Sequence, residues 1–260
     1  MASSLRLPIL GVLLAIAITT TMDATGLTVF SALPLLPLMG IFWSLERLSR
    51  KSVGFAWSRW PHYGLAVLHP IVVIGALLLI VTATGAADLA RTHWSKAWLN
   101  FARVAAATIP GAAITEEGFF RGWLWASLER AGQPPKKAIA WTSAAFALWH
   151  VSAVSLKTGF DLPAERIPIF LLNVAAIGVI WGLMRWISGS LLVTSVSHGV
   201  WNGGAYVFFG FGTKVGALGV HNTALFGPEV GLLGLALNVA FAAALWLWTK
   251  RRPMRATSLT

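Results

Sequence analysis

Two adjacent carboxylates and an arginine interrupt a long apolar stretch of the chain. Glu116, Glu117 and Arg121 lie within residues 97–128, where Arg103 is the only other charged residue. Charges at membrane depth are costly and are normally kept where they pair, face a cavity or take part in function. Glu117 and Arg121 are four residues apart, so they share a helix face and can form an ion pair. Glu116 points about 100° away from Glu117, so the two carboxylates are predicted to have different roles.

Two later apolar stretches carry further polar groups. His150 ends a Phe-x-x-x-His motif that begins at Phe146, and His198 begins a His-x-x-x-Asn motif that ends at Asn202. Residues four apart share a helix face. Counted at about 1.5 Å per residue from the nearest predicted turn, these groups and Glu116 lie roughly 14–21 Å deep. The three stretches are therefore expected to present their polar groups to one interior.

This set of groups fits the hydrolysis of a peptide bond. A carboxylate in a low-dielectric environment can act as a general base on water, so Glu116 is predicted to activate water, with His150 orienting it. His198 and Asn202 can donate hydrogen bonds to the oxyanion that forms when water attacks a peptide carbonyl. The neighbouring ion pair is predicted to hold Glu116 in place.

The composition indicates a multi-pass membrane protein. Of the 260 residues, 57% are hydrophobic and 11% are charged, whereas soluble domains carry roughly 25% charge. The chain has no cysteine, which excludes disulfides and thiol catalysis. Since a helix needs about 20 apolar residues to span a bilayer, we predict an all-α bundle of about eight transmembrane helices. The predicted spans are 7–22, 26–44, 64–85, 97–128, 137–155, 167–185, 190–209 and 230–249.

Two of these spans have special features. The first resembles a secretory signal but lacks a small-residue cleavage site, so it is expected to be retained. The fourth is overlong, and the pair Pro110 and Gly111 is expected to kink or break it. The chain is expected to divide into residues 1–96 with three helices, a catalytic core at 97–209, and an outer loop, last helix and basic tail at 210–260.

The net charge of +11 sorts to one side of this predicted topology. Basic loops mark the cytosolic side of membrane proteins, so both termini are predicted to be cytosolic, in a plasma or inner cell membrane. This distribution accounts for the whole net charge, so no nucleic acid partner is expected. The predicted cytosolic charges are Arg6, Arg47, Arg50, Lys51, Arg59, Arg130, Lys136, Lys137, Arg185, Lys250, Arg251, Arg252 and Arg255, against Glu46 and Glu129.

The three motifs, in this order, resemble those of the CPBP intramembrane proteases, the family of CAAX proteases and bacteriocin-processing enzymes also called Abi. The family's usual Phe-Arg-Gly is present at 120–122, and the resemblance spans roughly residues 97–206. It implies an eight-helix core with a conical, water-accessible cavity. One departure is Gly118, where relatives usually carry a larger apolar residue, and it predicts looser local packing.

The resemblance also implies roles for individual residues. Glu116 would be the catalytic base and His150 its partner on the water, while His198 and Asn202 would form the oxyanion site. The residues that would support these groups are Glu117, Arg121 and Phe146.

Several alternatives stay open. Glutamate with two histidines is a possible zinc triad, but no His-Glu-x-x-His motif is present, so a glutamate mechanism without metal or cofactor is favoured over a zinc-dependent protease. A non-catalytic membrane scaffold or immunity-type protein of the same fold would need none of the catalytic groups. A transporter built from inverted repeats would show a mirrored second half, and none is evident.

The expected partners are the lipid bilayer and a peptide or membrane-protein substrate, prenylated or not; the oligomeric state stays open.

Overall fold

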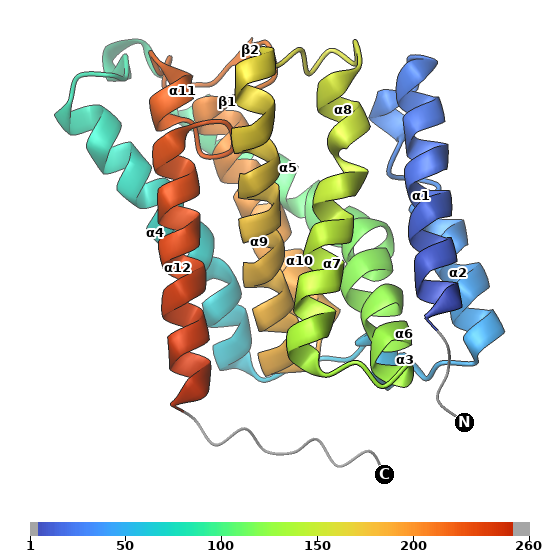
Figure 1. Cartoon of the computed structure of the whole chain (residues 1–260). Helices are drawn as coiled ribbons and strands as arrows, with labels where there is room; N and C mark the ends of the chain where they lie inside the picture. The colour runs from blue at the N-terminus through green and yellow to red at the C-terminus, as the bar shows by residue number, and fades with distance from the viewer. Residues whose placement is uncertain (1–4, 252–260) are drawn as a thin grey trace.

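The computed structural model describes residues 5–251, which form a helical bundle (Figure 1). The long helices are α1 (Arg6–Ala24), α2 (Leu35–Glu46), α4 (Trp60–Ala83), α5 (Trp94–Ile114), α7 (Pro135–Trp149), α9 (Ile167–Ser188), α10 (Leu191–Gly204) and α12 (Leu232–Lys250). The short helical elements are η1 (Thr28–Phe30), α3 (Arg50–Val53), η2 (Leu89–Arg91), η3 (Gly118–Leu124), α6 (Trp125–Arg130), α8 (Val151–Ser155), η4 (Ala164–Arg166), η5 (Ala205–Phe209) and α11 (Thr223–Phe226). Two antiparallel strands of two residues each, β1 (Gly210–Phe211) and β2 (Lys214–Val215), form one hairpin with Gly210 opposite Val215.

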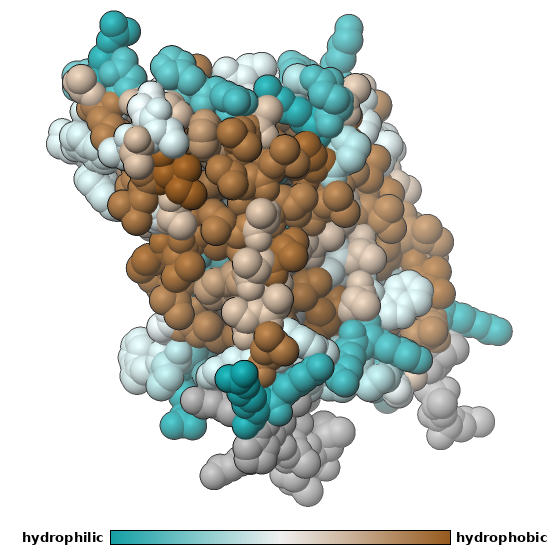
Figure 2. Space-filling view, turned by 60° about the vertical axis from the view of Figure 1, so that its left-hand side comes forward, coloured by the Kyte–Doolittle hydropathy of each residue, from teal (hydrophilic) through white to brown (hydrophobic). Residues whose placement is uncertain are grey.

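Six helical segments of the described chain are long and apolar enough to cross a membrane. They match six of the eight predicted spans. The other two predicted spans, 97–128 and 190–209, are interrupted helices, built from α5, η3 and α6 and from α10 and η5. Figure 2 shows a broad apolar band between two hydrophilic ends, as expected of a protein embedded in a bilayer. The membrane-length segments are Arg6–Ala24, Thr28–Glu46, Trp60–Ala83, Pro135–Ser155, Ala164–Ser188 and Leu232–Lys250.

The helices run alternately up and down the bundle. The N-terminal end of α1 and the C-terminal end of α12 both lie at the lower end in Figure 1. The connections from α2 to α4 and from α6 to α7 lie at that end too. The first carries four of the basic residues assigned to the cytosol, and the helix ends that flank the second carry three more, Arg130, Lys136 and Lys137. Arg252 and Arg255 of the predicted basic tail lie outside the described residues.

The fourth predicted span breaks at Thr115, and not at Pro110 and Gly111. Pro110 lies inside α5, which ends at Ile114, and Thr115 leaves the helical region with φ −113° and ψ −97°. The Thr115 hydroxyl donates to the Gly111 carbonyl at 2.8 Å. Side chains of this type compete with backbone hydrogen bonds, which accounts for a helix end five residues after the proline. The helix resumes at Glu116 and passes into the π-helical turn η3, a form often found at functional sites.

Gly118 lies where two parts of the bundle approach closely. A Cβ atom added at Gly118 would be 2.6 Å from the Ala113 carbonyl oxygen and 2.7 Å from the Met39 sulfur. The expectation of looser packing at Gly118 was therefore wrong. The absence of a side chain lets the π-helical turn lie directly against α2 and the end of α5.

Two charges counted with the cytosolic loops are buried at the lower end of the bundle. The Glu46 carboxylate accepts hydrogen bonds from Trp123 Nε1 at 2.7 Å and Ser127 Oγ at 2.8 Å. Arg185 Nε donates to the backbone carbonyl of Arg121 at 2.9 Å. These bonds join α2 and α9 to the segment that carries the candidate catalytic glutamate.

Candidate active site

All four residues predicted to be catalytic line one cavity of about 230 Å³. Glu116 comes from the start of the resumed helix, His150 from the junction of α7 and α8, and His198 and Asn202 from successive turns of α10. The three motifs are separated in the sequence by about 30–50 residues, and the bundle brings them together. The expectation that three stretches present their polar groups to one interior agrees with this geometry.

The residues that line the cavity belong to elements in the middle and at the upper end of the bundle, as these are placed in Figure 1. Helix α9 lines it with Phe170, Val174, Ile177 and Trp181, which follow one face from the first turn to just past the middle. The lower end of α9 contributes no lining residue. Loops and short elements at the upper end add Val29, Phe160 and Phe211 to the apolar lining, and Thr28 beside them.

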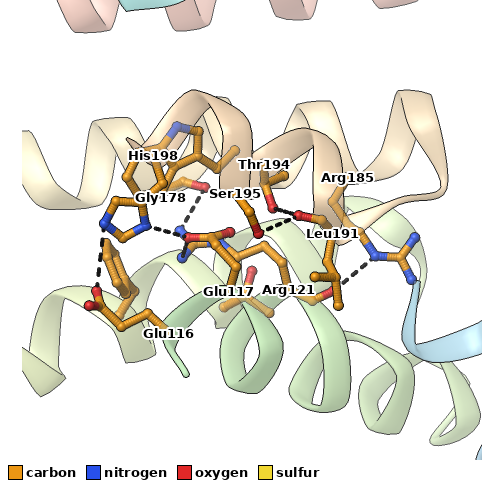
Figure 3. A network of polar contacts seen from close by, with 12 residues as sticks. Glu116, Glu117, Arg121, Gly178, Arg185, Leu191, Thr194, Ser195 and His198 are labelled. Atoms are coloured by element: carbon orange, nitrogen blue, oxygen red, sulfur yellow. Dashed lines mark hydrogen bonds and ion pairs between the residues drawn. The ribbon is translucent and has the colours of Figure 1, made fainter. Parts of the chain in front are cut away.

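Glu117 is fully buried and makes two polar contacts through one oxygen (Figure 3). Its Oε1 is 3.1 Å from Arg121 NH1 and 3.1 Å from His198 Nδ1. The predicted ion pair is therefore present, but it does more than hold its neighbour in place. By accepting from Nδ1, Glu117 fixes the orientation of the His198 ring and directs Nε2 at the cavity, because the bond made by one ring nitrogen sets the role of the other.

Glu116 faces the other nitrogen of the same histidine. Its Oε2 lies 3.9 Å from His198 Nε2 (Figure 3). The Glu116 side chain is 20% exposed, whereas that of Glu117 is 0% exposed. The two adjacent carboxylates thus differ in environment as their 100° separation predicts. Glu116 faces the cavity, and Glu117 faces the interior of the protein.

His150 is oriented by its own helix. Its Nδ1 donates to the Phe146 carbonyl at 2.8 Å, so in the neutral ring Nε2 carries a lone pair and can accept a hydrogen bond. The rings of Phe146 and Trp149 contact the imidazole edge-on, with centroids 4.6 and 4.8 Å away. These contacts restrict the ring to one orientation at the cavity wall.

Asn202 lines the cavity one turn after His198. Its side-chain amide makes no hydrogen bond within the described part of the chain, residues 5–251. The amide N–H groups are therefore free to donate to a bound molecule.

Two aromatic side chains cover the buried polar groups. The Phe146 ring lies 4.3 Å from the Arg121 guanidinium carbon, and the Trp181 ring lies 5.3 Å from it, which are cation–π distances. Trp181 also stacks on His198 with centroids 4.3 Å apart. Sequence reasoning selected Phe146 but missed Trp181. Its position away from both ends of an apolar helix, where tryptophan does not serve as an interfacial anchor, was the available signal.

Sequence reasoning also missed Trp201, Tyr206 and Glu229, which line the same cavity. Glu229 was assigned to an outer loop with no role. Its Oε1 accepts a hydrogen bond from Trp201 Nε1 at 3.0 Å. A single glutamate in a glycine-rich loop gives no pattern that could have placed it here.

The side chains of the candidate zinc triad, Glu116, His150 and His198, are not gathered around one point in the described residues. Within residues 5–251, no three His, Asp or Glu side chains are placed to hold one metal ion. His198 Nδ1 contacts Glu117, so Nε2 is the ring nitrogen that faces Glu116 and the cavity.

Comparison with known proteins identifies the segment that holds these motifs. A comparison with curated proteins finds no match. Residues 97–204 match the family model described as type II CAAX prenyl endopeptidase Rce1-like, and this segment carries Glu116, His150, His198 and Asn202. This match confirms the resemblance drawn from the three motifs: residues 97–204 are similar to type II CAAX prenyl endopeptidases of the Rce1-like family.

Proposed function

We propose that the protein is an intramembrane endopeptidase of the CAAX-protease type that works through a glutamate-activated water. The observation that carries the proposal is the convergence of Glu116, His150, His198 and Asn202 on one cavity within the Rce1-like segment. A scaffold of the same fold would have no need to place these four groups around one space.

In the proposed reaction, water binds between Glu116 and His150 Nε2. Glu116 takes a proton as the water oxygen bonds to the carbonyl carbon of the substrate, and the carbonyl oxygen becomes an oxyanion. The Asn202 amide and His198 Nε2 donate to that oxyanion. Nδ1 of His198 already donates its proton to Glu117. The ring must therefore be protonated at Nε2 as well when Nε2 donates to the oxyanion. Each oxyanion donor of this kind contributes about 10²–10³-fold to the rate.

We further propose eight transmembrane segments with both termini in the cytosol of a plasma or inner cell membrane. The support is that the basic loops gather at the lower end of the bundle, as the positive-inside rule requires. The cavity reaches the upper end, so a substrate peptide or membrane protein would enter from the outer side. The substrate is a proposal at the level of this class, and it includes prenylated and unprenylated peptides.

The proposed orientation can be measured because the chain has no cysteine. Lys157→Cys introduces one thiol at the upper end and Lys136→Cys one at the lower end, and both positions are exposed. In spheroplasts, a membrane-impermeant maleimide is expected to label Lys157→Cys at once and Lys136→Cys only after permeabilisation. The reverse pattern would show that the lower end faces outward.

Metal independence is tested on the purified protein. With a farnesylated CAAX peptide as the probe, we expect a strong chelator to leave the rate of hydrolysis unchanged, since the proposed water is bound by Glu116 and His150 alone. The measurement is the release of the C-terminal tripeptide by mass spectrometry. Loss of the activity on chelation and its return with added zinc would replace the glutamate mechanism by a metal-dependent one.

A further inference from the structure

Glu229 is the second carboxyl group on the catalytic cavity. Among residues 5–251, only Glu116 and Glu229 contribute carboxyl groups to the lining. Glu229 also lines an adjoining outer cavity of about 290 Å³ and so lies where the two cavities meet. Its carboxylate is bonded to Trp201, which lies between His198 and Asn202 on α10. Glu229 is therefore held beside the proposed oxyanion donors.

A buried chain of hydrogen bonds holds the backbone of this loop. The Asn173 amide donates to the carbonyl oxygens of Pro228 and Glu229 at 2.6 and 3.0 Å. Asn173 accepts from Asn238 at 2.9 Å, and Asn238 accepts from His69 Nε2 at 2.9 Å. These residues come from α9, α12 and α4. Satisfied buried networks of this kind specify one geometry, so the bundle itself fixes the position of Glu229.

The turn around Glu229 is closed by glycines that have no room for a side chain. A Cβ atom at Gly227 would lie 2.6 Å from the Thr223 carbonyl oxygen, and one at Gly231 would lie 2.5 Å from the Gly227 nitrogen. The Gly231 N–H donates to the Gly227 carbonyl at 3.0 Å. The loop is thus a compact turn, and its carboxylate is presented from a fixed backbone.

Burial raises the pKa of the Glu229 carboxyl to about 7, although the hydrogen bond from Trp201 opposes this shift. Near neutral pH the group is therefore a mixture of acid and carboxylate, and the acid form is lost as the pH rises through about 7. A general acid works best when its pKa lies near the working pH. The titratable groups that share its two cavities are Glu116, His150, His198 and Tyr206 on the inner side and Asp161, Arg166 and Lys214 on the outer side.

We propose that Glu229 is the general acid that protonates the leaving amine, a role that rests on the proposed function. Glu116 and His150 occupy the side of the attacking water, and His198 and Asn202 occupy the side of the oxyanion. Glu229 is the remaining carboxyl group of the cavity. We therefore assign it to the side of the scissile nitrogen.

The proposed step follows the formation of the tetrahedral intermediate. The carbon–nitrogen bond breaks, its electron pair goes to nitrogen, and nitrogen takes the proton from Glu229. The oxyanion re-forms the carbonyl of the new carboxylic acid. Glu229 then regains a proton through cavity water from Glu116, which holds the proton of the attacking water. The net reaction consumes one water and one peptide bond and yields an acid and an amine.

A pair of substrates that differ only in the leaving group tests this role. The probes are a farnesylated CAAX peptide with the normal scissile amide and the same peptide with a thioester at that bond. A thiolate leaves without a proton because its conjugate acid has a pKa of about 8.5. We expect Glu229→Gln to lower kcat/KM for the amide by about 10²-fold or more and to leave thioester hydrolysis close to wild type. The wild-type fall in amide hydrolysis above pH 7 is expected to disappear in this variant.

Controls separate this role from a structural one. Glu165→Gln removes an exposed carboxylate at the upper end that lines neither cavity, and it is expected to change neither rate. Glu229→Asp keeps an acid and is expected to recover part of the amide activity. Equal losses on amide and thioester, or no loss on either, would overturn the general-acid role while the proposed endopeptidase stands. Full amide activity in Glu116→Gln would instead overturn the proposed function and with it this role.

Discussion

Replacement of Glu116 by glutamine is expected to lower peptide-bond hydrolysis by about 10²–10⁴-fold, the range for loss of a general base. The amide keeps the size of the side chain but cannot take a proton from water. The fold should survive, because the side chain faces the cavity and its nearest charged contact is His198 at 3.9 Å. The measurement is kcat/KM on the farnesylated peptide, with thermal unfolding in detergent as the check on folding.

A matched control uses another glutamate of the same segment. Glu129→Gln removes an exposed carboxylate at the lower end of the bundle, and it is expected to leave the rate unchanged. If both variants retained wild-type rates, Glu116 would not be the base. If both lost activity together with thermal stability, the loss would report unfolding.

The second large effect is expected at the buried ion pair. Arg121→Met removes the cation and leaves Glu117 buried without its partner, which costs about 3–5 kcal/mol when one member of such a pair is lost. Both side chains are 0% exposed, so solvent cannot compensate. We expect a large fall in the thermal unfolding temperature and in the yield of folded protein.

A double variant separates stability from function at the same pair. Glu117→Leu with Arg121→Met replaces both charges by apolar side chains, which is often neutral or stabilising. This protein is expected to regain most of the lost stability but little of the activity, because His198 Nδ1 no longer meets a carboxylate. A double variant with wild-type activity would show that Glu117 does not orient the histidine.

The parts of the site that follow from local periodicity could be predicted from the sequence. Helical geometry alone separates Glu116 from Glu117 and pairs Glu117 with Arg121, because both relations lie within about one turn. Counting residues from the charged turns also gave comparable depths for the three motifs. The common cavity could be predicted because each motif has its own depth and helix face, and these agree on three helices.

The parts that were missed depend on contacts between distant segments. The close approach at Gly118 depends on Met39 in another helix. Glu229 reaches the cavity only because Asn173, 56 residues earlier in the chain, holds its backbone. Local pattern carries no information about such pairings, so an outer loop was the natural interpretation of Glu229.

The most direct test of an endopeptidase centred on Glu116 is a comparison of membrane fractions from cells that carry either the wild-type protein or Glu116→Gln. Peptide termini in the two fractions are identified by quantitative mass spectrometry, at equal amounts of the two proteins. We expect that at least one peptide or membrane protein accumulates uncut with Glu116→Gln and that its cleaved terminus is present only with the wild type. Identical sets of termini in both fractions, together with an unchanged phenotype, would contradict proteolysis and favour a scaffold.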